Sequence, residues 1–513
     1  MKIEKKMFKN LIEKHYKYLG LSTFFIFFVY KIQKIQNVKI LYGDDSWVVV
    51  GSNYSNFIEK LLCCSITYPG ISLLHQLLFQ ITQNTTTYLL IVFFISCGLM
   101  LFISLSENND LEPKFKILFL LLLYSSPMLV NYSIRSKPYI FEAIIAFHLL
   151  IILNKTIRNN KFESKYLFLF GLFVFMSLTT IIPLFALLLV LIKRNLIKIK
   201  YSRVGLAFIF FSAFLTSVYG FLKRGTELES YWVAYYAPTE GGFILFFRWL
   251  FYSLIRILSE SNKLDLGASS FSILISTILI FLGILFVLKN KQKRFKLEFI
   301  SLIFIINLIL STLKIFPFGG SRANIYYMIL VIYLIVLGIK LIYEKLNFNN
   351  FVVIFFIVVS VFYAFSLPIN YFQTTRFFNQ NAAEKVIEFV NTSSENIVLY
   401  HGGVWTIGSY INDSLDMEKK GLNFSGSGVG NVPIPIFNKD SLYVPCAKHK
   451  ITGHCKDTIK NFLNSKDFKV YYLAAIHIRE YQYQEYLDAF EELGFIKSVL
   501  VSELEVELVK FEK

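Results

Sequence analysis

Apolar runs of about 20 residues recur along most of this chain, and this feature constrains its fold more than any other. Runs of that length can cross the hydrocarbon core of a bilayer as α-helices. The composition agrees, because 55% of the 513 residues are hydrophobic and only 17% are charged, too few to cover a soluble domain of this size. The sequence therefore predicts a polytopic α-helical membrane protein.

The basic residues lie in clusters between the apolar runs, as the positive-inside rule places them in cytoplasmic loops. The net charge of +17 is therefore no sign of nucleic-acid binding. If all clusters face the cytoplasm, we expect about eleven spans, a cytoplasmic N-terminus and an extracytoplasmic C-terminus in the inner (cytoplasmic) membrane. The first run lacks a small-residue cleavage site, so we expect it to be retained as a span. The expected spans are 19–38, 84–105, 116–133, 138–154, 166–179, 181–193, 204–222, 269–288, 299–314, 323–343 and 350–368.

Two apolar segments need separate treatment. Residues 166–193 have basic clusters at both ends, and Pro183 suits the start of a helix better than its middle. We therefore predict two short spans with a break near Thr179. Residues 242–259 carry Arg248 and Arg256 near one helical face, which is typical of an amphipathic helix at the outer surface.

The composition changes after residue 368. Residues 369–513 mix apolar runs with polar loops, and we predict strands at 397–400, 470–474 and 495–501 and helices at 382–390 and 481–493. The sequence thus predicts a membrane domain over residues 1–368 and an extracytoplasmic α/β domain over residues 369–513.

Asp44 and Asp45 directly follow the first expected span. Adjacent acids near hydrocarbon repel each other and are costly there, so the pair indicates a metal, a substrate hydroxyl or a proton to be bound. The alternative is a solvated turn, since Gly-Asp-Asp-Ser is good turn chemistry.

Basic residues on the outer side are rare under the positive-inside rule, so Arg135, Lys137 and Arg322 stand out. Arginine presents a planar fork that suits phosphate, here that of a lipid carrier. The alternative is snorkelling to ordinary lipid phosphates. Glu142 lies one turn into the next span, where a carboxylate is expensive; we favour pairing with Arg135 over a metal or acceptor role. A lone histidine such as His75 is more often packed than a ligand.

Cys446 and Cys455 flank a loop that also contains His449 and His454. Their spacing matches no standard zinc site, and an outer compartment favours oxidation. We favour a disulfide over free thiols, and free thiols over zinc.

The order of these features resembles the GT-C class of membrane glycosyltransferases, and most closely the bacterial family 39-like proteins that resemble protein O-mannosyltransferases and the aminoarabinose transferases of lipid A. Asp44-Asp45 stands where those proteins have an Asp-Glu pair, and residues 68–75, ending in His75, loosely represent their His-Pro-Pro-Leu segment. Residues 135–139 resemble an Arg-x-Tyr motif, and residues 316–322 a Tyr-Pro-Phe-Gly-Gly-x-Arg stretch. The Asp-Asp pair and the missing Pro-Pro depart from the pattern.

The resemblance implies inverting transfer of a sugar from a polyprenyl-phosphate donor to a glycan, lipid or protein acceptor at the membrane, with no nucleic acid involved. Asp44 or Asp45 would be the general base, and the same pair could hold a divalent cation, Mg or Mn. Further residues would bind the substrates. The phosphate-binding candidates are Arg135, Lys137 and Arg322, and the substrate-binding candidates are His75, Tyr139, Glu142, Tyr231 and Tyr235.

Three other functions remain open from the sequence. A transporter or flippase of lipid-linked glycans would also be polytopic, but transporters place ionisable groups near mid-membrane and often contain repeats, and none is evident here. An O-antigen polymerase or ligase would be expected to have its key loop late in the chain. A catalytically inactive relative could serve as a scaffold.

Overall fold

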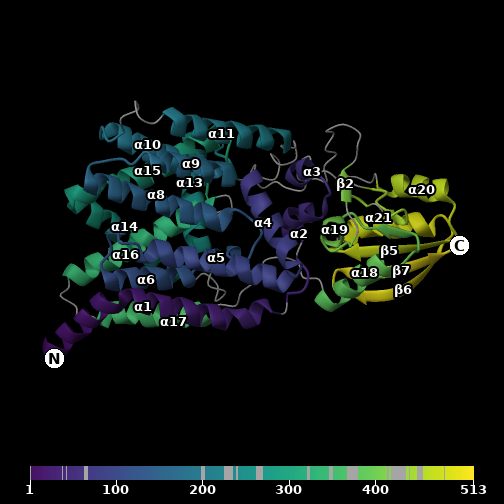
Figure 1. The fold of residues 1–513 in the computed structure, drawn as a ribbon, viewed down its shortest axis with the longest axis horizontal. Coiled ribbons are helices and arrows are strands. Elements are labelled where there is room, and N and C mark those ends of the chain that lie inside the picture. The colour runs from purple at the N-terminus through teal and green to yellow at the C-terminus, as the bar shows by residue number, and fades with distance from the viewer. Residues whose placement is uncertain are drawn as a thin grey trace. The chain divides into compact units, whose positions relative to one another are not determined.

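The N-terminal two thirds of the chain form long helices and the last third a mixed α/β region (Figure 1). The computed structural model describes residues 2–36, 38–41, 43–62, 68–197, 203–223, 235–238, 241–261, 270–319, 324–345, 351–366, 379–412, 415–417, 435–437, 439–446, 455–478 and 480–513. The chain divides into two compact units. The first holds residues 1–35, 90–215 and 232–369, and the second holds residues 36–89, 216–231 and 370–513.

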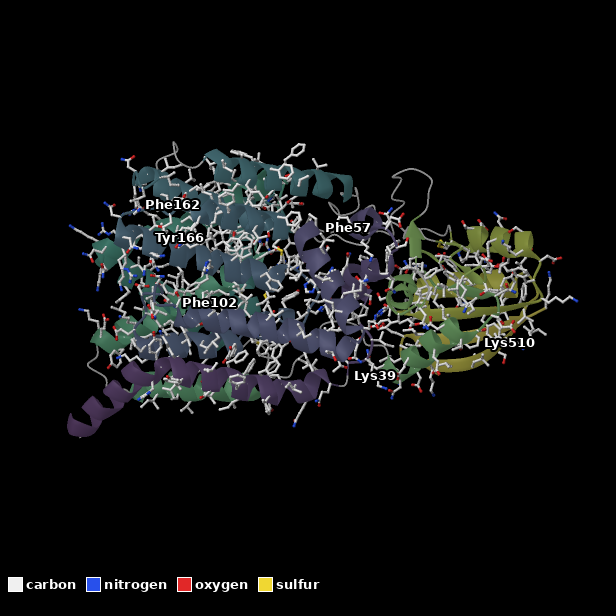
Figure 2. The ribbon with its side chains drawn as sticks, in the orientation of Figure 1. Lys39, Phe57, Phe102, Phe162, Tyr166 and Lys510 are labelled. Carbon is white, nitrogen blue, oxygen red and sulfur yellow. A yellow bond between two sulfur atoms is a disulfide. The ribbon has the colours of Figure 1, made fainter. Side chains whose placement is uncertain are left out.

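The first unit is helical. Within the described residues, four helices are long and apolar enough to cross a membrane, and further apolar helices are shorter. The polytopic helical class is thereby confirmed, while the number of spans stays a prediction. Exposed side chains such as Phe102 lie on the outside of these helices, where a bilayer would cover them (Figure 2). The helices wholly or mainly in this unit are α1 (Lys2–Ile35), α5 (Thr85–Leu105), α6 (Pro113–Tyr124), α7 (Pro127–Tyr132), α8 (Tyr139–Asn159), α9 (Lys165–Met176), α10 (Ile181–Lys193), α11 (Arg203–Lys223), α13 (Gly242–Ser261), α14 (Ser270–Lys289), α15 (Arg294–Thr312), α16 (Tyr326–Lys345) and α17 (Phe351–Ser366).

The predicted break within residues 166–193 is present. Helix α9 ends at Ser177, whose backbone is extended, and a short 3-10 turn (Leu178–Thr180) leads into α10. Pro183 falls in the first turn of α10, where a missing N–H costs no helical hydrogen bond. The segment predicted as an amphipathic helix is the helix α13, and its position at the outer surface stays a prediction.

Helix α16 is the centre of the first unit, since every residue from Tyr326 to Leu341 is buried. It packs against α14 through glycines on both helices. A Cβ atom on Gly283 of α14 would lie 2.1 Å from the carbonyl oxygen of Leu334, and one on Gly338 of α16 would lie 2.0 Å from the carbonyl oxygen of Leu279. Small residues of this kind let membrane helices approach closely.

An ionic cluster joins the loop between α5 and α6 to α16, to α15 and to the 3-10 turn before α15. Asp110 pairs with Lys296 and Lys293 and accepts a hydrogen bond of 2.7 Å from the hydroxyl of Tyr333. The Lys296 side chain is almost fully buried. Glu112 pairs with Lys340 of α16. These contacts compensate charges that would be costly to bury alone.

The second unit contains a five-stranded sheet in the order β4-β1-β5-β7-β6, in which β1 runs parallel to β4 and β5 and the other neighbours are antiparallel. The predicted strands at 397–400, 470–474 and 495–501 correspond to β1, β5 and β6, and the two predicted helices to α18 and α21. The elements are α18 (Gln380–Thr392), β1 (Ile397–Leu399), α19 (Val404–Ser409), β2 (Leu415–Met417), β3 (Pro435–Phe437), β4 (Leu442–Tyr443), α20 (Cys455–Lys466), β5 (Val470–Ile476), α21 (Glu480–Glu491), β6 (Ile496–Glu503) and β7 (Val506–Glu512).

Strand β6 lies at the edge of this sheet and is exposed along most of its length. Its pairing with β7 is irregular in the middle, because Val499 lies opposite Val509 while Val501 lies opposite Leu508. Leu500 is therefore an extra residue, and the strand contains a β-bulge.

The second unit also includes the first predicted outer loop. That loop forms α2 (Gly43–Val49), a 3-10 turn (Val50–Asn53), α3 (Phe57–Leu62) and α4 (Pro69–Thr82). Val50 and Tyr54 are part of the hydrophobic core that also contains Ile397 and Trp405. Residues 36–89 and 370–513 therefore fold as one body, which the sequence did not indicate.

Candidate active site

The acid pair lies in a helix, and the alternative of a solvated turn is wrong for its second member. Residues 43–49 form α2, and Asp45 is fully buried. The Asp44 side chain lies outside the described residues. A buried carboxylate is costly unless its surroundings or a ligand compensate it, so the burial of Asp45 supports a chemical role.

Ser46 connects α2 to two other segments of the second unit. Its hydroxyl donates to the carbonyl oxygen of Leu41 at 2.9 Å and lies 3.3 Å from the hydroxyl oxygen of Thr406 in α19. The Ser409 hydroxyl in turn donates to the carbonyl oxygen of Ser46 at 3.1 Å. The ring of Trp47 meets that of Trp405 edge to face, with centroids 5.8 Å apart.

Tyr410, which caps the C-terminal end of α19, holds the chain before the acid pair. Its hydroxyl accepts the backbone N–H of Leu41 at 2.8 Å and pairs with the hydroxyl of Thr85. Burial, reinforced by the negative charge of Asp45, raises the pKa of Tyr410 well above its usual range. Tyr410 is thus a neutral hydrogen-bonding group near the acid. Nothing in the sequence pointed to Tyr410 or Thr406.

His75 is fully buried on α4, a helix that packs against α2. Its Nδ1 lies 2.8 Å from the hydroxyl of Tyr88, and this contact orients the ring. The neighbouring Gln76 approaches the backbone so closely that a Cβ atom on Gly51 would lie 2.2 Å from its Nε2. Helices α2 and α4 thus pack against each other in the second unit, and both have buried polar residues.

Arg135 and Lys137 lie in the first unit, on the loop between α7 and α8. Both are buried, with 8% and 5% of their surfaces exposed, and Ser136 between them is fully buried. A side chain that snorkels to lipid headgroups keeps its charged end at the surface, so burial argues against that alternative.

Glu142 does not pair with Arg135, so the pairing favoured from the sequence is wrong. Its carboxylate accepts a hydrogen bond of 2.5 Å from the hydroxyl of Ser177, which also lies 2.9 Å from the hydroxyl of Thr179. Within the part of the chain that the structure describes, Glu142 makes no ion pair. The break before α10 supplies these hydroxyls, which explains why that break is polar.

The aromatic candidates are only partly described. The ring of Tyr139 packs edge to face on Tyr132, with centroids 5.1 Å apart. The Tyr235 ring lies 5.4 Å from the guanidinium of Arg256, and its carbonyl oxygen accepts the N–H of Phe318 at 2.9 Å. Tyr231 and Arg322 lie outside the described residues.

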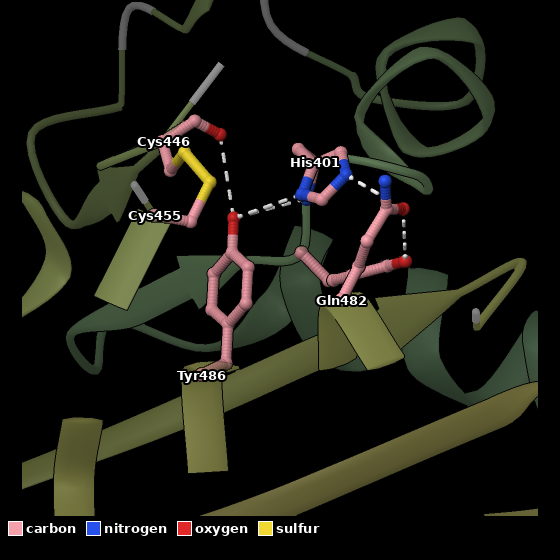
Figure 3. Close-up of a disulfide and its surroundings, with 6 residues drawn as sticks. His401, Cys446, Cys455, Gln482 and Tyr486 are labelled. Atoms are coloured by element: carbon pink, nitrogen blue, oxygen red, sulfur yellow. Dashed lines mark hydrogen bonds between the residues drawn. A yellow bond between two sulfur atoms is a disulfide. The ribbon is translucent and has the colours of Figure 1, made fainter. Parts of the chain in front are cut away.

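The structure joins Cys446 and Cys455 in a disulfide, the state favoured from the sequence (Figure 3). The Tyr486 hydroxyl donates to the carbonyl oxygen of Cys446 at 3.3 Å and contacts Nδ1 of His401 at the same distance. Nε2 of His401 lies 3.2 Å from the amide oxygen of Gln482. These hydrogen bonds attach the disulfide to the end of β1 and to α21.

The described residues do not by themselves fit a divalent metal. Among them, no three His, Cys, Asp or Glu side chains come together as a group that could hold a metal ion. Mg²⁺ and Mn²⁺ prefer several oxygen ligands, and Asp45 is the one carboxylate that the structure describes on α2 and α4. No chemical step is therefore derived through a metal.

No protein-family model and no curated protein matches this sequence. Solved structures do match. ArnT from Cupriavidus metallidurans bound to undecaprenyl phosphate is 11% identical, covers 96% of this chain and 97% of its own, and has a TM-score of 0.58. The archaeal oligosaccharyltransferase AglB from Archaeoglobus fulgidus, in complex with an inhibitory peptide and a dolichol-phosphate, is 12% identical, covers 94% and 73%, and has a TM-score of 0.51. The chain has the GT-C fold, as the resemblance predicted.

Proposed function

We propose that this protein is a membrane glycosyltransferase that moves a sugar from a polyprenyl-phosphate donor to an extracytoplasmic acceptor, with inversion at the anomeric carbon. The observation that carries the proposal is the buried Asp45 on α2, directly after the first helix of a GT-C fold. The similar structures of ArnT and AglB contain undecaprenyl phosphate and dolichol-phosphate, which supports a lipid-phosphate donor.

In the proposed reaction, Asp45 takes the proton from an acceptor hydroxyl as that oxygen attacks the anomeric carbon. The bond between this carbon and the phosphate oxygen breaks on the opposite face, and polyprenyl phosphate leaves with the electron pair. A base must reach the hydroxyl at hydrogen-bond distance, and the hydrogen bonds of Ser46 fix the helix that carries the carboxylate. Asp44 is the second candidate for this role.

Arg135 and Lys137 would bind the donor phosphate, together with Arg322. Their burial supports this role, because a cation in a site with little water stabilises the charge of a leaving phosphate more strongly than an exposed one. His75, Tyr139, Glu142, Tyr231 and Tyr235 are the proposed substrate contacts.

The multi-pass membrane class agrees with this function. We propose an inner-membrane location with a cytoplasmic N-terminus, and an extracytoplasmic region from residue 369 that selects the acceptor. The acceptor would be a glycan, a lipid or a protein.

The test is mass spectrometry of cell-surface glycans and glycolipids from cells that lack the gene. The cells are complemented with wild type, Asp44→Asn, Asp45→Asn, or the control Asp457→Asn, which changes an exposed acid on α20. A glycan that lacks one sugar in the deletion, and is restored by wild type and control but not by Asp45→Asn, supports the transferase. Restoration by both acid-pair variants at wild-type protein levels would reject it and favour transport or polymerisation of lipid-linked glycans.

A further inference from the structure

Helix α19 occupies the edge of the sheet where α/β proteins usually bind ligands. It follows the carboxyl end of β1, which is parallel to β5, and ligands commonly bind at the carboxyl ends of parallel strands. In this protein α19 fills the space at the carboxyl ends of β1 and β5. A Cβ atom on Gly403 would lie 2.9 Å from the carbonyl oxygen of Ile476, and one on Gly408 would lie 3.1 Å from the Val50 side chain. Helix α19 is thus packed between the end of β5 and the segment that follows α2.

The α19 region contacts the chain immediately before the acid pair. The hydroxyl of Tyr410 accepts the N–H of Leu41 at 2.8 Å, and its carbonyl oxygen accepts from the side-chain amide of Asn391 at 2.9 Å. Asn391, a residue of α18, therefore holds the backbone of Tyr410 in place. Leu41 is fully buried and Tyr410 is half-buried, so the hydrogen bond between them is partly shielded from water.

The α19 region also contacts the chain immediately after the acid pair. The Ser46 hydroxyl donates to the carbonyl oxygen of Leu41, and its oxygen lies 3.3 Å from the hydroxyl oxygen of Thr406. The hydroxyl oxygen of Thr406 also lies 3.2 Å from Nε2 of His477, directly after β5. The resulting series of contacts runs from the end of β5 through α19 to α2.

We infer that α19 is the positioning element of the acid pair: Tyr410 holds the chain on one side of Asp45, and Thr406 with Ser409 holds it on the other. Only residues 42–45 lie between the two attachment points. This inference rests on the proposed function, since it assigns these residues to the alignment of the proposed base. Thr406 and Tyr410 act through Asp45 and need not touch substrate.

The expected effect is large because a base must approach its proton within a few tenths of an ångström. A misplacement of about 1 Å costs on the order of 100-fold in rate. Thr406→Val keeps the shape of the side chain and removes the hydroxyl, while Thr406→Ser keeps the hydroxyl. We expect Thr406→Val to lower the yield of the completed glycan per molecule of protein by about tenfold or more, and Thr406→Ser to stay close to wild type.

The coupling between Thr406 and Ser46 is tested with Ser46→Ala and the double variant. If the two hydroxyls act as one connection, the double variant loses no more activity than the more damaging single variant. If the activity loss of the double variant equals the product of the two single-variant losses, the two residues act independently, and the inference is overturned. Tyr471→Phe is the matched control for Tyr410→Phe. The hydroxyl of Tyr471 also hydrogen-bonds a backbone group, here donating to the carbonyl oxygen of Leu463, but Tyr471 belongs to the other core of the sheet.

Hydrogen exchange on the purified full-length protein gives a readout that needs no substrate. We expect Thr406→Val and Tyr410→Phe to speed exchange of the backbone amides of residues 43–49, and Tyr471→Phe to leave it unchanged. Faster exchange with undiminished glycan yield would overturn the inference, and so would unchanged exchange in both variants. If Asp45→Asn keeps full activity, the proposed function fails by itself, and the exchange experiment still decides whether α19 holds α2.

Discussion

Gly283 of α14 and Gly338 of α16 lie opposite each other where the two helices pack. A Cβ atom added to Gly283 would lie 3.3 Å from the backbone nitrogen of Gly338 and closer still to the carbonyl group of Leu334. Backbone atoms cannot move aside as a flexible side chain can. The contact between these two helices therefore depends on the absence of side chains at both positions, and α16 is the buried centre of the first unit.

Alanine at either glycine should separate the helices. We expect Gly283→Ala and Gly338→Ala each to destabilise the protein by about 1 to 3 kcal/mol, the usual cost of overpacking. Thermal unfolding in detergent measures the effect. Gly98→Ala on α5 is the matched control, since nothing lies within 4 Å of the added methyl group. A drop in melting temperature for Gly98→Ala as large as for Gly338→Ala would contradict this explanation.

If Arg135 binds the lipid phosphate, replacing it with lysine should weaken that binding, although the positive charge remains. Lysine cannot present a planar fork, so Arg135→Lys should weaken binding of undecaprenyl phosphate by about tenfold, or about 1.4 kcal/mol. Equilibrium binding to the purified protein measures this. Arg158→Lys serves as the control, because Arg158 is exposed on α8 and bonds Asn108. Equal affinity of wild type and Arg135→Lys would remove Arg135 from the donor site.

The ionic cluster at Asp110 predicts a pH-dependent contribution to stability. Burial alone would raise the pKa of Asp110, but Lys296 and Lys293 outweigh it and hold that pKa below its usual range. A lowered pKa in the folded state means that the stabilisation is complete above the unfolded pKa of about 4 and is lost as the pH falls below it.

Asp110→Asn should therefore destabilise the protein most at neutral pH. It leaves the buried Lys296 without its counter-charge, which costs about 2 to 4 kcal/mol. The difference in melting temperature between wild type and Asp110→Asn should shrink as the pH is lowered from about 5 to 3. A difference that stays constant over this range would show that the charge of Asp110 does not stabilise the fold.

The disulfide between Cys446 and Cys455 should stabilise the second unit modestly, because it closes a short loop with a sequence separation of 9. The chain-entropy relation gives about 2 to 3 kcal/mol. Cys446→Ser should lower the unfolding temperature of this unit and make it insensitive to reductant. Wild type should fall to the same value when reduced. Cys97→Ser, which removes a buried free thiol from the first unit, should leave the reductant response intact.

Much of the fold could be predicted because its signals are local. Long apolar runs gave the helices, and the polar break before Pro183 gave the separation of α9 from α10. Strand β7 was missed for an equally local reason: the turn before it places Glu505 at positive φ, where hairpin signals normally have Gly or Asn.

The candidate site was only half predictable. The acids and cations carry their chemistry in their residue types, so Asp45, Arg135 and Lys137 could be proposed from the sequence. The residues that hold the segment around Asp45 in place could not be predicted from the sequence. Thr406 belongs to a helix of six residues that is too short to show periodicity, and Tyr410 caps the end of that helix. They meet Ser46 and Leu41 across more than 300 residues of chain. Burial of such pairs is a tertiary property that no short motif encodes.

The β-bulge at Leu500 hinders aggregation between copies of the protein in one membrane. Strand β6 lies at the edge of the sheet and has exposed apolar side chains, among them Ile496 and Leu500, so a strand from a neighbouring molecule could pair with it. Val499 pairs with a residue of one core of the sheet and Val501 with a residue of the other, so the alternation of faces reverses halfway along the edge. An incoming regular strand can match one half of β6 only, and the bulge thereby protects a crowded protein from aggregating through its most exposed strand.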